Sequence, residues 1–156
     1  MAAKRVSLSR YLRYRLGEGN DVELLKAMIA RAFTARSFSD FWRYWNPVYG
    51  YALDRWCYRP LHRVLPRPVA VVLTFTACGF LLHDVPFGWA ITFATTGRVS
   101  FPLIGAWFLL IGLAVVAGEA LRLDFRRLGS PCRVLLHVAH LVLPFLAAWW
   151  LSTTLR

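Results

Sequence analysis

Three long apolar runs fill the second half of this sequence and constrain its fold more than any other feature. They cover residues 69–97, 101–121 and 134–155. At a rise of about 1.5 Å per residue, even the shortest run can cross a hydrocarbon core of about 30 Å as an α-helix. The 156 residues are 58% hydrophobic and 17% charged, whereas soluble domains are about 45–50% apolar and about 25% charged. The sequence therefore predicts an all-α integral membrane protein with three transmembrane helices.

Basic residues concentrate ahead of the first run and after the second. Residues 1–68 contain 13 basic and 5 acidic side chains, and the connection after residue 121 contains four arginines, against one in the connection after residue 97. By the positive-inside rule, the N-terminal region and the second connection lie in the cytoplasm. We therefore expect a protein of the bacterial inner membrane with a cytoplasmic N-terminus. We expect no nucleic-acid partner, because the basic residues flank apolar runs.

Amphipathic segments precede the spans. Asn20 and Ser37 each stand three residues ahead of an acidic residue, a spacing typical of helix N-caps. Residues 1–36 form a basic amphipathic segment suited to the headgroup layer, and residues 37–67 form an interfacial helix with an aromatic face. The predicted organisation is thus an N-terminal segment, 1–36, followed by a membrane core, 37–156.

The aromatic helix contains a break. Pro47 lacks the N–H that a helix interior requires and moves the preceding residue out of helical geometry. Asn46 therefore lies at a break, where its polar side chain leaves the regular face. In a membrane-associated element, such a break is tolerated only where protein or a water-filled cavity satisfies the freed polar groups.

His83 lies at the midpoint of the first run, next to Asp84. Ionisable side chains at bilayer depth are costly and usually face a bundle interior or a cavity, which favours a functional histidine. The alternative is that two helices end there in a re-entrant turn, helped by Pro86 and Gly88. The residues alone leave both interpretations open.

Two further histidines and a glutamate lie in the later spans. His137 and His140 are three residues apart, but no cysteine or carboxylate has a matching spacing, so we expect interfacial or interhelical hydrogen bonds and no metal site. Glu119, near the end of the second run, is expected to pair with a nearby arginine.

Residues 38–61 (FSDFWRYWNPVYGYALDRWCYRPL) and 74–84 (TFTACGFLLHD) resemble the C-terminal core of the membrane-bound O-acyltransferases. The similar branch contains the diacylglycerol and sterol acyltransferases, and the resemblance covers residues 38–121. Three motifs occur in the family's order: Phe41, Trp42, Trp45 and Asn46 match the first, Tyr58, Pro60 and Leu61 the second, and Ala77, Gly79, Phe80 and His83 the third.

The resemblance implies a helical bundle enclosing a tunnel, with acyl-CoA as co-substrate, no further cofactor, and a hydroxyl of a lipid or small molecule as acceptor. His83 is then the general base, and Asn46 supports it or the thioester. Trp42 and Trp45 are assigned to substrate binding. Arg59 and Arg63 belong to a basic stretch that attracts the CoA phosphates. The alternative explanation of the same stretch is positive-inside topology alone.

Family members are much longer and have many more spans. A chain of this size completes a cavity as a homo-oligomer or with another membrane protein, or it is a reduced relative without catalysis. The second hypothesis is therefore a non-catalytic subunit of a larger membrane complex. Small residues in the second run could make its close helix contacts: Gly105, Gly112, Ala114 and Gly118. Membrane lipids are expected partners in either case.

Overall fold

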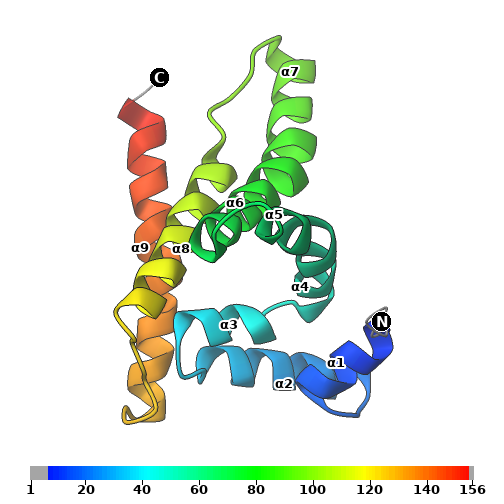
Figure 1. The fold of residues 1–156 in the computed structure, drawn as a ribbon. Helices are drawn as coiled ribbons and strands as arrows, with labels where there is room; N and C mark the ends of the chain where they lie inside the picture. The colour runs from blue at the N-terminus through cyan, green and yellow to red at the C-terminus, as the bar shows by residue number, and fades with distance from the viewer. Residues whose placement is uncertain (1–6, 155–156) are drawn as a thin grey trace.

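The computed structural model describes residues 7–154, and every regular element in that range is helical (Figure 1). Residues 1–6 and 155–156, at the ends of the predicted N-terminal segment and third span, lie outside the described residues. Three helices are long and apolar enough to cross a membrane: Arg67–Thr96, Leu103–Ala120 and Ser130–Thr154. The prediction of an all-α membrane protein is confirmed, and the three spans begin and end close to the predicted limits.

The first span is one continuous helix with a widened middle. It consists of α6 (Arg67–Gly79), the π-helical segment η2 (Phe80–Trp89) and α7 (Ala90–Thr96). Pro86 lies inside η2, where its ring would clash with a carbonyl of the preceding turn of an α-helix. The wider π-helical turn relieves this conflict, and such turns often occur at functional sites. The helix therefore runs through His83, and the re-entrant turn is not formed.

The second span, α8 (Leu103–Ala120), packs very closely against α6 and η2. A Cβ atom added at Gly79 would lie 2.5 Å from the carbonyl oxygen of Ile104, and one added at Gly112 would lie 3.2 Å from the Cα atom of Val72. The two backbones can approach this far only because both positions are glycine. Small residues of α8 that the subunit hypothesis assigned to a partner thus make contacts within the chain.

The third span, α9 (Ser130–Thr154), packs against α8. The indole N–H of Trp107 on α8 donates a hydrogen bond of 2.9 Å to the carbonyl oxygen of Leu141. Large apolar side chains remain exposed along α9, on a face suited to lipid: Leu135, Val138, Val142, Leu143, Leu146, Trp149 and Trp150.

Between residue 7 and the first span, the structure has six short helical elements, so the predicted interfacial helix over 37–67 is divided into four. The elements are α1 (Leu8–Leu16), α2 (Asp21–Phe33), α3 (Phe38–Tyr44), α4 (Pro47–Leu53), the π-helical η1 (Asp54–Tyr58) and α5 (Arg59–His62). The two predicted N-caps are confirmed: Asn20 forms a reciprocal capping box with Glu23, and the Ser37 hydroxyl accepts from the N–H of Asp40.

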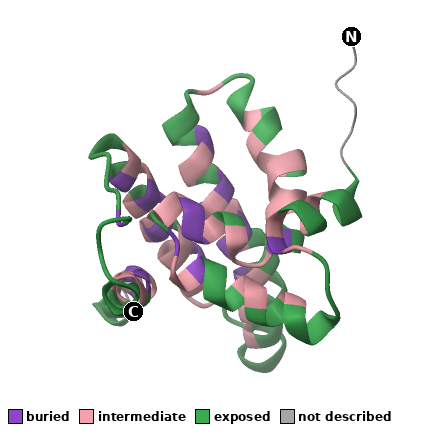
Figure 2. Ribbon diagram, turned by 90° about the horizontal axis from the view of Figure 1, so that it is seen from below, coloured by how far each residue is buried: buried purple, intermediate pink, exposed green. Residues whose placement is uncertain are grey.

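Helices α1–α3 lie across one end of the bundle, beside the connection between α8 and α9 (Figure 1). The N–H of Phe125 in that connection donates to the carbonyl of Arg36 at 2.8 Å, and Arg133 donates to the carbonyl of Thr34 at 2.8 Å. The basic N-terminal region and the second connection are therefore at the same end of the molecule. Buried residues gather where this layer meets the bundle (Figure 2), around Phe41 and Ala32.

Candidate active site

A cavity of about 690 Å³ lies between the N-terminal helices and the first span. Asn46 and His83, which are 37 residues apart in the sequence, both line it. Trp42, Trp45 and Phe108 contribute aromatic surface to the same walls. All of these lining residues come from a single copy of the chain.

Asn46 occupies the break ahead of Pro47, as predicted. Its backbone is left-handed, with φ 43° and ψ 69°, a conformation that asparagine tolerates better than most residues. Its side-chain oxygen accepts a hydrogen bond of 3.4 Å from the N–H of Tyr49 and so caps α4. Because the oxygen is engaged by the helix, the amide N–H groups are the part of Asn46 that can donate to a ligand.

The ring of His83 has a defined orientation. Its Nδ1 atom lies 3.0 Å from the carbonyl oxygen of Cys78. A carbonyl oxygen only accepts hydrogen bonds, so Nδ1 carries the proton in the neutral ring and Nε2 retains its lone pair. The ring stacks on Phe108 at a centroid distance of 5.8 Å, and Nε2 has no hydrogen-bond partner among residues 7–154. His83 is therefore arranged to accept a proton at Nε2.

Asp84, which follows His83 in the sequence, has a structural role in the contact between two spans. The side chain is buried, and its carboxylate accepts hydrogen bonds from the N–H groups of Ile104, at 3.0 Å, and Gly105. These groups are in the first turn of α8, where Pro102 provides no side-chain cap. A carboxylate there satisfies free N–H groups and interacts favourably with the helix dipole. Asp84 thus joins the first span to the second as a helix cap.

The remaining predicted binding residues divide into two groups. Trp42, Trp45 and Arg59 line the cavity, whereas Arg63 is exposed at the end of α5 and does not. The indole of Trp42 donates a 3.0 Å hydrogen bond to Nε2 of His140, which fixes its orientation. Arg59 is paired with Asp54 at 2.8 Å.

Helix α1 supplies cavity residues that the sequence analysis missed. Tyr11 and Arg15 line the cavity, and the guanidinium of Arg15 lies 5.1 Å from the ring centre of Tyr11. Ser7 caps this helix. A serine followed by apolar and aromatic residues at helical spacing, from Leu8 onwards, was the available signal.

The histidines of α9 make hydrogen bonds of the predicted kind: His137 to the connection between α2 and α3, and His140 to helix α3. Nε2 of His137 lies 3.0 Å from the carbonyl oxygen of Ala35 and donates to it, and His140 accepts from Trp42. Glu119 pairs with Arg67 at the start of α6, as expected of a nearby arginine. Within residues 7–154, no group of three or more His, Cys, Asp or Glu side chains is placed to hold a metal ion.

Searches with this chain found no matching family model, curated protein or solved structure. The fold and the site themselves define its class: an all-α membrane protein with three candidate spans and an aromatic, arginine-rimmed cavity that contains an asparagine and a histidine.

Proposed function

We propose that this protein is an O-acyltransferase, similar to the membrane-bound O-acyltransferases, that moves an acyl group from acyl-CoA to a hydroxyl. The observation that carries the proposal is the shared cavity of Asn46 and His83, in which Nε2 of the histidine has no hydrogen-bond partner from residues 7–154. The cavity volume of about 690 Å³ is within the range of about 300–1,000 Å³ typical of ligand pockets.

The proposed reaction is a direct transfer. The acceptor oxygen attacks the thioester carbon while Nε2 of His83 takes the hydroxyl proton. The amide N–H of Asn46 donates to the oxyanion that forms. The C–S bond then breaks, and the CoA sulfur leaves with the proton returned by the imidazolium, so that the ester, free CoA and neutral His83 are the products.

The cavity surroundings suit these substrates. Arg15, Arg43, Arg59 and Arg67 line it. The last three are each paired with a carboxylate, and Arg15, which has no ion pair among the described residues, provides positive charge for the CoA phosphates. Trp42, Phe75 and Phe108 form a cluster of aromatic rings that offers apolar surface to an acyl chain and excludes water from the thioester. In this proposal the end bearing α1–α3 faces the cytoplasm, the source of acyl-CoA, as the positive-inside rule requires.

The experiment is acyl transfer by the purified protein in lipid nanodiscs. Acyl-CoA is supplied with a set of lipid and small-molecule alcohols, and free CoA and ester are measured together. His62→Gln is the matched control, because His62 is exposed outside the cavity and stacks on Tyr58. General-base catalysis contributes about 10²–10⁴-fold, so His83→Gln should lose a factor in that range while His62→Gln keeps the wild-type rate. Equal rates for the two variants would contradict the assignment.

The second hypothesis, a non-catalytic subunit, makes the opposite prediction in the same assay. It expects no transfer with any alcohol, and co-purification of a partner in fixed stoichiometry. Its sequence support was the small size of the chain, whose three spans expose much lateral surface, together with small residues on α8 available for close helix contacts. Gly105 and Gly112 instead lie against the first span, and Gly118 lies against Phe38.

A further inference from the structure

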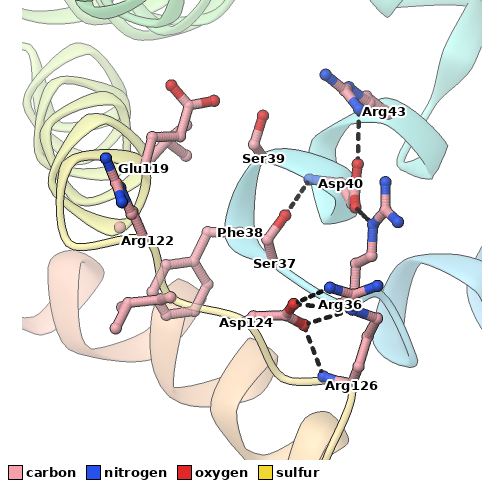
Figure 3. A pocket seen from close by; sticks show the side chains of 13 residues that line it. Arg36, Ser37, Phe38, Ser39, Asp40, Arg43, Glu119, Arg122, Asp124 and Arg126 are labelled. Carbon is pink, nitrogen blue, oxygen red and sulfur yellow. Dashed lines mark hydrogen bonds and ion pairs between the residues drawn. The ribbon is translucent and has the colours of Figure 1, made fainter.

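A second pocket, of about 450 Å³, opens where α3 meets the end of α8 and the segment that follows it (Figure 3). Ser39 and Arg43 line both this pocket and the His83 cavity, but His83 and Asn46 line only the larger one. The proposed transfer chemistry makes no use of this second pocket. Its charged lining is made of arginines and carboxylates.

The arginines outnumber the available carboxylates. Asp40 is shared by Arg36, at 2.6 Å, and Arg43, at 2.8 Å. Asp124 pairs with Arg126 at 2.6 Å. The third carboxylate of the lining, that of Glu119, is held in two hydrogen bonds by Arg67. Only Asp40 and Asp124 therefore remain to neutralise the arginines of the lining, so the pocket has a net charge of +2. The four arginines are Arg36, Arg43, Arg122 and Arg126.

Arg122 has a left-handed backbone conformation that is unusual for an arginine. The N–H of Arg122 bonds to the carbonyl of Glu119, and the N–H of Leu123 bonds to that of Gly118. This pair of bonds is a Schellman motif, and Arg122 is its left-handed residue, with φ 52°. Glycine is strongly preferred at that place, since a side chain there is strained. The sequence has an arginine instead, and its guanidinium makes no hydrogen bond or ion pair among the described residues.

The pocket lies at the end of the second span, where a membrane-spanning helix leaves the hydrocarbon core. Val115 and Gly118 of α8 form part of its wall, and the apolar span ends at Ala120. In Figure 3, Arg122 extends from the end of α8 on one side, and Arg36 and Arg126 lie on the other. In a bilayer, the residues just beyond the end of a span are at the level of the lipid phosphates. Guanidinium groups are well matched to phosphate oxygens.

We propose that this pocket binds an anionic phosphate group, and that Arg122 is held in its left-handed position to contact it. An anionic phospholipid headgroup or a soluble phosphate could present this group, and both share the chemistry that the arginines recognise. The inference does not depend on acyl transfer: a protein without that activity would still bind the phosphate.

The test uses the full chain, purified in a neutral detergent and stripped of lipid. Phosphatidylglycerol, phosphatidylcholine or inorganic pyrophosphate is then titrated, and binding is followed by native mass spectrometry and thermal stability. Arg122→Gln is compared with Arg127→Gln, which removes the same charge from the same connection but does not line the pocket. Arg122→Gly separates binding from structure, because glycine suits the left-handed backbone.

We expect wild type and Arg127→Gln to prefer phosphatidylglycerol to phosphatidylcholine, or to bind pyrophosphate. The first result identifies a lipid source and the second a soluble one. Arg122→Gln and Arg122→Gly should lose about tenfold or more in affinity, as expected for one charged hydrogen bond, and Arg122→Gly should be no less stable than wild type without ligand. Equal affinities of the Arg122 and Arg127 variants, or no binding of any anionic phosphate, would overturn the proposal.

Discussion

Gly79 offers a direct test of the packing that positions His83. In Gly79→Ala, the new Cβ atom would lie 2.5 Å from the carbonyl oxygen of Ile104 and 2.8 Å from Cβ of Phe108. The carbonyl oxygen of Ile104 belongs to the backbone and cannot rotate away as a side chain can, so α6 and α8 must move apart. Over-packing costs about 1–3 kcal/mol, and the helix propensity of alanine returns up to about 1 kcal/mol. A contact of 2.5 Å with a backbone atom corresponds to the upper half of the over-packing range, about 2–3 kcal/mol, so we expect a net loss of about 1–2 kcal/mol in the free energy of unfolding.

The loss can be measured by unfolding in mixed dodecyl maltoside and SDS micelles, followed by tryptophan fluorescence. Gly129→Ala is the control, because its nearest new contact is an ordinary 3.8 Å from Pro131. Phe108 stacks on His83, so Gly79→Ala should also slow acyl transfer. A Gly79→Ala protein as stable as wild type would show that the two helices are not in such close contact.

Three further predictions concern the contacts that join the elements. Asp84→Ala leaves the first turn of α8 without its cap and should cost about 2–3 kcal/mol in the same unfolding assay; unchanged stability would refute the capping role. Trp42→Phe removes the donor to buried His140 and should cost about 1–3 kcal/mol, which an unaltered unfolding curve would contradict. Hydrogen bonds from Arg126 lower the pKa of exposed Asp124 to about 2. A lowered pKa means that the carboxylate stabilises the fold above about pH 4 and ceases to do so as the pH falls to about 2. The melting temperatures of wild type and Asp124→Asn should therefore converge over that interval, and a constant difference would count against the ion pair.

Local signals in the sequence predicted much of this fold. The apolar runs gave the spans, because the length needed to cross a bilayer is fixed. The caps at Asn20 and Ser37 and the break at Pro47 depend on neighbouring residues only, and all three occur where predicted.

Contacts between distant residues could not be predicted in the same way. Asp84 directly follows His83 in the sequence, but its hydrogen-bond donors are backbone N–H groups 20 and 21 residues further on. Arg59, the first residue of α5, lines the cavity, while Arg63, which follows the last residue of α5, does not. Helix α1 packs against α4 and thereby contributes to the cavity wall.

The central claim, proton transfer to Nε2 of His83, is tested most directly by chemical rescue. His83→Ala removes the ring from a cavity of about 690 Å³, which leaves room for free imidazole. We predict that added imidazole restores a concentration-dependent part of acyl transfer to His83→Ala and none to Asn46→Ala, whose missing group is a hydrogen-bond donor. Transfer by His83→Ala at the wild-type rate without imidazole would contradict the account.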